Sequence, residues 1–140
     1  MKLYLAVMAA VLLGGAAYAA DPAPITVTPV TRTNTTITGQ RIVVPGKPDV
    51  IVATAVFAPG ARLPEHQHPY PHYVYVQEGV LTVVVTERPQ RTFEVKAGEF
   101  VAEPMHTWHY GINNGAVPLK LLVIDQVPAG TKSNMVPRNP

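Results

Sequence analysis

The chain has 140 residues, of which 47% are hydrophobic and 14% charged, so it has room for one folded domain with a packed core. Its formal net charge of +2 at pH 7 excludes the strongly basic field that nucleic-acid-binding proteins use. It has no cysteine, which excludes both a disulfide framework and a thiolate metal site. We therefore expect a small molecule or a metal ion as partner, and no nucleic acid.

Residues 1–19 have the features of a secretory signal peptide. Lys2 gives a positive start, residues 3–13 form an apolar run, and Ala17-Tyr18-Ala19 is a small-x-small cleavage signal. The alternative, a membrane anchor, needs about 20 apolar residues, and this run ends earlier in two glycines. We expect cleavage after Ala19, no stable membrane insertion afterwards, and a periplasmic or secreted protein.

The mature chain is expected to be all-β. Residues 20–35 are rich in Pro and Thr and predict an extended N-terminal arm, and residues 128–140 predict a flexible C-terminal tail. Residues 36–127 carry short β-prone runs separated by turns, with no sustained helical period, which predicts one antiparallel barrel or sandwich domain. The expected strands are 37–44, 50–57, 73–77, 80–86, 92–95, 99–102 and 119–126.

All five histidines lie within residues 66–109. His66, His68 and His72 share one face of an extended segment, because side chains alternate along a strand. A lone histidine is more often hydrogen-bonded or exposed than a ligand, but an H-x-H pair on one face presents two nitrogens to one ion. A metal site is the economical interpretation of this cluster.

Two motifs in register resemble those of the cupin family. Residues 60–79 fit G-x5-H-x-H-x3-4-E-x6-G, and residues 98–113 fit G-x5-P-x-G-x2-H-x3-N. The resemblance implies a double-stranded β-helix, or jelly-roll, barrel. Two positions depart from the pattern: His72 replaces the usual glutamate, and His106 replaces the usual glycine. Histidine is among the non-glycine residues enriched in left-handed turn geometry, so we expect such a turn at His106.

By this resemblance the metal ligands are His66, His68, His72 and His109, a shell similar to that of some small all-histidine cupins. The cofactor it implies is one divalent transition metal ion, and all-nitrogen ligation suits Mn, Fe, Cu, Ni or Zn alike. With no anionic ligand the ion would keep its full charge and favour anionic substrates.

Several residues near the ligands are candidates for a pocket or for contacts that orient a ligand. Tyr70 shares the strand face of the histidines, and Met105 and Trp108 flank His109, so some of these are expected to line an apolar cavity beside the metal. His106 is expected to lie at the turn. Glu103 could accept a hydrogen bond from a ligand N–H, although a lone glutamate at a strand end is more often solvated.

The resemblance implies a metal-dependent, dioxygenase-like enzyme acting on a small organic molecule. The alternative is a non-catalytic periplasmic module that binds a metal or a small ligand, because a fold alone does not fix a function. The sequence contains no nucleophile triad or phosphate-binding loop, so it does not indicate which residues would be catalytic. Pairing into a homodimer through the N-terminal arm is a further expectation, because small cupins commonly pair.

Overall fold

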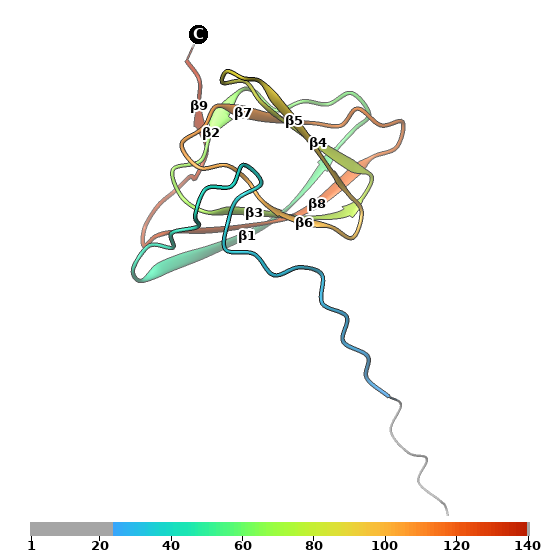
Figure 1. Cartoon of the computed structure of the whole chain (residues 1–140), viewed down its shortest axis with the longest axis horizontal. Helices are drawn as coiled ribbons and strands as arrows, with labels where there is room; N and C mark the ends of the chain where they lie inside the picture. The colour runs from blue at the N-terminus through green and yellow to red at the C-terminus, as the bar shows by residue number, and fades with distance from the viewer. Residues whose placement is uncertain (1–23, 140) are drawn as a thin grey trace, which may run out of the picture.

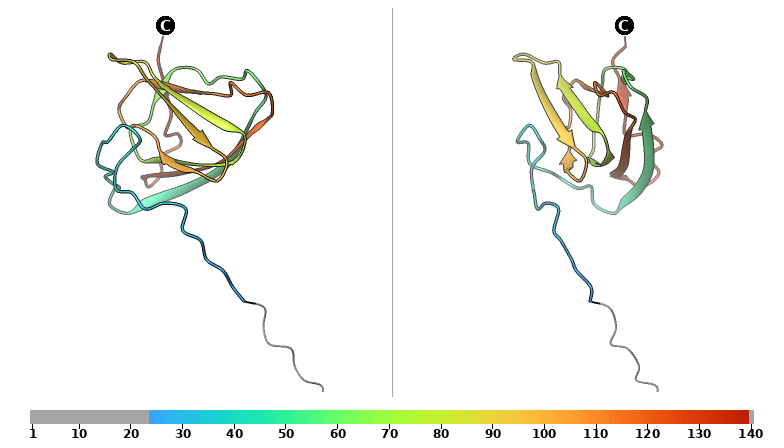
Figure 2. Two further views of the ribbon diagram at one scale, coloured as in Figure 1. Left: turned by 45° about the vertical axis from the view of Figure 1, so that its right-hand side comes forward. Right: turned by 90° about the vertical axis from the view of Figure 1, so that its right-hand side faces the viewer.

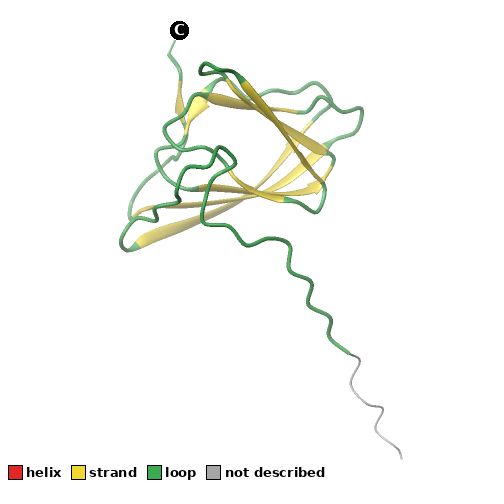
Figure 3. Ribbon diagram, in the orientation of Figure 1, coloured by secondary structure: helices red, strands yellow, loops and turns green. Residues whose placement is uncertain are grey.

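The computed structural model describes residues 24–139, so the expected signal peptide at residues 1–19 lies outside it. The described chain consists of strands and loops, as Figure 3 shows, and it contains no helix of the length and hydropathy needed to cross a membrane. The strands are β1 (Pro48–Phe57), β2 (His66–Gln67), β3 (His72–Glu78), β4 (Val80–Val85), β5 (Arg91–Lys96), β6 (Phe100–Ala102), β7 (His109–Ile112), β8 (Leu119–Pro128) and β9 (Val136–Pro137).

The strands form two sheets that face each other. One sheet has the order β1-β8-β3-β6 and the other β5-β4-β7-β2-β9, with antiparallel pairing between all neighbouring strands. Figure 1 shows the first sheet along the bottom of the barrel and the second along the top, and the right-hand view in Figure 2 shows the two layers from the side. The expected all-β jelly-roll barrel is confirmed.

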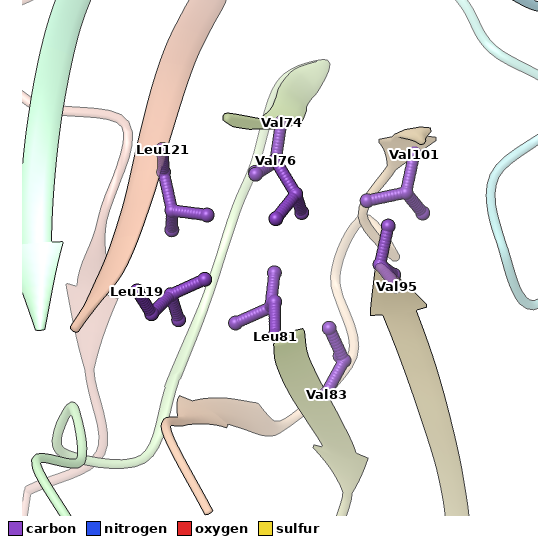
Figure 4. Packing of buried hydrophobic residues seen from close by; sticks show 8 residues of the cluster. All are labelled: Val74, Val76, Leu81, Val83, Val95, Val101, Leu119 and Leu121. Carbon is purple, nitrogen blue, oxygen red and sulfur yellow. The ribbon is translucent and has the colours of Figure 1, made fainter. Parts of the chain in front are cut away.

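The apolar core lies between the two sheets. Its members come from β3, β4, β5, β6 and β8, and Figure 4 shows them pointing toward one another. They are Val74, Val76, Leu81, Val83, Val95, Val101, Leu119 and Leu121. Burying such side chains stabilises a fold by about 1.5–3 kcal/mol each, so this cluster can support a domain that has no disulfide.

The inner faces of β3 and β8 lead from this core to the histidines. Val76 pairs with Leu121, Val74 with Val123, and His72 with Asp125, each pair two residues further along its strand. Because alternate residues of a strand share a face, His72 and Asp125 point to the same side as the core residues. The inner surface of the barrel therefore changes from apolar side chains at the core to ionisable side chains at His72 and Asp125.

One expected strand is not formed. Residues 37–39 instead form a turn, and residues 40–44 continue as a loop. Thr36 N–H donates to the Gln40 carbonyl across the turn, and Thr35 and Arg41 form an isolated bridge. Gly39 has a φ of 89°, a conformation that glycine adopts without strain. The Thr36 and Thr38 hydroxyls bond to each other, so local hydrogen bonds to side chains replace a ladder.

The C-terminal segment differs from the flexible tail that we expected over residues 128–140. β9 pairs with β2, Arg138 N–H donates to the Glu65 carbonyl, and Asn134 is buried. The expectation rested on the low apolar content of the segment, but polar contacts to the barrel hold it instead. By contrast, residues 24–33 form no strand and are exposed, as Figure 1 shows for the arm that leads away from the barrel.

Candidate metal centre

Three histidines are brought together by strand pairing and by a short loop. His66 on β2 lies directly opposite His109 on β7, so their side chains emerge on one face as neighbours. His68 follows β2, and its carbonyl accepts a hydrogen bond from His106 N–H. The three rings are almost fully buried, with centroids 4.7–5.1 Å apart.

The Nδ1 atom of each of these rings faces a backbone carbonyl. His66 Nδ1 lies 2.8 Å from the Pro64 oxygen, His68 Nδ1 2.8 Å from the Asn134 oxygen, and His109 Nδ1 2.7 Å from the Thr107 oxygen. A carbonyl only accepts, so Nδ1 carries the proton in each ring and Nε2 is the basic nitrogen. This arrangement fixes both the tautomer and the orientation that a metal-binding imidazole needs.

The Nε2 atoms meet at the carboxylate of Glu103, which follows β6. Glu103 Oε2 lies 3.2 Å from His68 Nε2, 3.2 Å from His109 Nε2 and 3.8 Å from His72 Nε2. Two donors on one ion with bonds of about 2.1 Å are separated by roughly 3–3.4 Å, so the two 3.2 Å spacings suit donors that share an ion, whereas His72 lies further away. Sequence reasoning named Glu103 only as an outer acceptor.

His72 stands at the edge of this group. Its ring stacks on that of His68, with centroids 3.9 Å apart and planes inclined by 6°. Its Nδ1 donates a 2.7 Å hydrogen bond to Asp125 Oδ1, which leaves Nε2 as the basic nitrogen. Potential metal-binding groups therefore overlap: His66, His68, Glu103 and His109 form one, and His68, His72 and Asp125 form another.

The ionisable groups of the site influence one another strongly. Burial lowers the pKa of His66 to about 4, and it also lowers the pKa of His68. Burial acts in the same direction on His109, but the hydrogen bond and the charge of Glu103 outweigh it and raise the pKa of His109. Burial alone would raise the pKa of Glu103, yet hydrogen bonds from the Nε2 atoms of His109 and His68, which donate when those rings carry a second proton in the metal-free site, hold it well below its usual range. Glu103 is therefore an anion among basic nitrogens.

The C-terminal segment closes one side of the site through Asn134. Its carbonyl accepts from His68, its side-chain oxygen accepts from Tyr70 N–H, and its Nδ2 donates to Asp125 Oδ1 over 2.6 Å. Asn134 therefore helps to orient two histidines. Its main-chain carbonyl binds His68, and its side chain binds Asp125, which in turn binds His72. Neither Asp125 nor Asn134 was predicted, because only the strand register and the return of the chain end bring them to the site.

The other predicted pocket residues lie apart from the histidine cavity. Tyr70, Met105 and His106 line a separate hollow together with Gln40 and Arg41. Trp108 is half-buried, with Arg138 over its ring at 5.2 Å. His106 has a φ of 51° and is exposed, as its expected role in a turn requires.

A cavity of about 230 Å³ adjoins the histidines. Its polar end consists of His66, His68, His72 and Glu103, and its remaining walls are apolar side chains and one glycine. A cavity with one polar end and an apolar body is the usual form of a small-molecule site. Buried basic nitrogens beside a carboxylate are also a donor set suited to a divalent transition metal, so the chemistry of the residues fits such an ion.

Comparisons with known proteins agree with this fold. A protein family described as "Cupin domain" matches residues 53–125. Oxalate decarboxylase from Lactobacillus farciminis, solved as a formate complex, is 26% identical with a TM-score of 0.53, and oxalate decarboxylase from Bacillus subtilis, studied for its Mn(II) centres, is 27% identical with a TM-score of 0.53. A Streptococcus pyogenes protein of unknown function, 17% identical with a TM-score of 0.50, shares the fold.

The extent of these matches is limited. The matched region covers 63% of this chain but only 26% and 23% of the two decarboxylase chains, and it covers 59% of this chain and 68% of the Streptococcus protein. No curated protein sequence matches the chain.

Proposed function

The chain belongs to the cupin family, and from that premise we propose that it is an exported, metal-dependent, dioxygenase-like enzyme acting on a small organic molecule. One observation carries the proposal. Histidines from β2, β3, β7 and the loop after β2 each hold Nδ1 on an acceptor, so that Nε2 is the nitrogen left for an ion.

The proposed nitrogen ligands are His66, His68, His72 and His109, with the Glu103 carboxylate as an added oxygen donor. The 3.2 Å contacts of Glu103 with His68 and His109 support its inclusion, because two basic nitrogens and an anionic oxygen gain most from a shared cation. With the charge of Glu103, a divalent ion would leave the site with one net positive charge rather than two. This differs from the shell of histidines alone that the sequence suggested.

The ion would be a divalent transition metal, with Mn, Fe, Cu, Ni and Zn all compatible with these donors. When bound, it would supply Lewis acidity and open coordination positions for a substrate and O2. The protein residues would orient the donors through their Nδ1 acceptors and would exclude bulk water from the apolar cavity.

Oxygen uptake tests the catalytic part of the proposal. Protein loaded with Fe(II) or Mn(II) would be screened in an oxygen electrode with small phenols, thiols and diketones, beside a His109→Ala variant. We expect substrate-dependent uptake that the variant loses. If one of these compounds binds saturably but the enzyme turns over none of them, the result would instead support a non-catalytic binding module.

Export and pairing are also proposals. The apolar run and Ala17-Tyr18-Ala19 support cleavage after Ala19, which N-terminal sequencing of periplasmic protein would check. A homodimer formed through the arm is supported by the exposure of Ile25 and Val27, which are 91% and 84% accessible. Persistence of a dimer after deletion of residues 20–35 would contradict the role of the arm.

A further inference from the structure

The size of the cavity beside the histidines depends on two alanines of β1. Alternation along this strand places Val52, Thr54 and Val56 on the outer face, where all three are exposed. Ala53 and Ala55 lie on the other face and line the cavity. A methyl group at each position leaves space that a larger side chain on the same backbone would fill.

The neighbours of these alanines are also apolar. Ala53 pairs with Val123 and Ala55 pairs with Leu121, and both partners line the cavity. Phe57 lines it too, beyond Ala55 on β1. Ala53 is itself exposed, whereas Ala55 is half-buried, so Ala53 lies nearer the mouth and Ala55 further inside.

The cavity has charge at one end only. Glu103 and the histidines form that end, and no lysine or arginine is among the described residues that line the cavity. A second anionic group on a ligand, directed away from the histidines, would therefore be desolvated against apolar walls without a partner, which costs several kcal/mol. The volume, about 230 Å³, is also below the roughly 300–1,000 Å³ of pockets for drug-sized ligands.

We propose that this cavity selects a compact organic molecule that has an apolar body and one anionic donor group, such as a carboxylate, enolate or phenolate, and that Ala53 and Ala55 set the size of the body. The inference rests on the proposed function, because the donor group would bind at the metal end. A dicarboxylate would leave its second charge against the apolar walls without a cationic partner.

Isothermal titration calorimetry of the Mn(II)-loaded full-length mature protein tests the inference, with propionate, butyrate, valerate and succinate as ligands. Each added methylene should tighten binding about threefold to fourfold until the cavity is full. Succinate, which is butyrate with its terminal methyl group replaced by a carboxylate, should bind at least about tenfold more weakly than butyrate, because the second carboxylate would be desolvated against apolar walls without a partner. Tighter binding of succinate than of butyrate, or equal affinity across the monocarboxylate series, would overturn the inference.

Variants of β1 test the role of the alanines. Ala55→Leu should weaken valerate binding by at least about tenfold, because its side chain occupies the cavity. Ala53→Leu, nearer the mouth and more tolerant of a larger side chain, should also weaken valerate more than propionate. Thr54→Leu makes the same addition on the outer face and should change neither affinity. Unchanged valerate binding in both alanine variants would contradict the assignment.

A ligand without a charge separates this inference from the proposed metal site. Metal content is measured on each sample, and 1-butanol is titrated into metal-free protein and into metal-free Ala55→Leu. Weaker butanol binding in the variant supports the cavity whether or not the protein holds metal. Failure to bind Mn(II) would overturn the proposed function alone, whereas butanol binding that is indifferent to Ala55→Leu would overturn the cavity.

Discussion

His72 on β3 lies directly opposite Asp125 on β8, and its Nδ1 donates a hydrogen bond of 2.7 Å to Asp125 Oδ1. Asp125 in turn accepts from Asn134 Nδ2 over 2.6 Å. Burial would raise the pKa of Asp125, but the hydrogen bond and charge of His72 outweigh it and lower that pKa. The carboxylate is therefore an anion whose orientation is fixed from two sides, and it fixes the His72 ring in turn.

Asp125→Asn should weaken metal binding by about 10–100-fold, the effect usual for removing a carboxylate that orients a histidine ligand. The amide keeps the shape of the side chain but removes its charge. Competition with a chelator of known affinity measures the change. Glu94→Gln removes a charge from the exposed side of β5 and serves as control. An unchanged affinity in Asp125→Asn would mean that His72 does not hold the ion.

Glu103→Gln should lower the pKa of His109, because the hydrogen bond and charge of Glu103 are what raise it against burial. Nuclear magnetic resonance titration of the His109 ring in metal-free protein measures this directly. The same variant should bind metal more weakly if the carboxylate is a ligand. A His109 pKa that does not move would show that the two side chains are not in contact in solution.

The lowered pKa of His66 predicts that the metal-free protein loses stability in mild acid. Its pKa is about 4 in the folded protein, against 6.5 for an unperturbed histidine, so between these values the unfolded chain binds more protons. The free energy of unfolding of metal-free protein should therefore fall as the pH is lowered from 6.5 to 4, with about 3 kcal/mol due to this residue.

The raised pKa of His109 changes the free energy of unfolding with pH in the opposite direction. Comparison of variants separates the contribution of His66 from that of His109. Urea unfolding with a chelator present, repeated across this pH range, should give a flatter profile for His66→Gln than for the unsubstituted protein. His106→Gln, at the exposed turn, should leave the profile unchanged. Parallel profiles for all three proteins would contradict the buried, neutral state of His66.

Asn134→Ala should destabilise the fold by about 1–3 kcal/mol, because it leaves partly buried partners without their hydrogen bonds. Those partners are Tyr70 N–H, the Tyr70 carbonyl and Asp125 Oδ1. Urea denaturation measures the loss. Asn114→Ala, at an exposed position with one 3.3 Å bond to Thr82, should cost much less. Equal effects would mean that the C-terminal segment does not pack against the site in solution.

The sequence predicted the fold class and most strands, because alternation of β-prone residues and turn residues is a local signal. It also brought His66 and His68 to one face, since two-residue spacing does so on any extended segment. The central position of Glu103 and the contact of Asp125 could not be predicted in this way. Both depend on which strands pair and in what register, and that is decided by packing of the whole barrel.

Local patterns also misjudged two segments. Residues 37–44 have β-prone side chains, yet Gly39 and the threonine hydroxyls favour a turn. The C-terminal segment has few apolar residues, but the buried side chain of Asn134 needs hydrogen-bond partners. The folded barrel provides them in the Tyr70 carbonyl and Asp125 Oδ1.

The proposed histidine site is tested most sharply by metal analysis of protein purified from the periplasm without added metal. We expect about one divalent transition metal ion per chain, lost in His68→Ala and in His109→Ala, sharply reduced in His72→Ala, and retained in His106→Ala. No metal in the unsubstituted protein, or equal metal in all of these variants, would contradict a site built from these histidines.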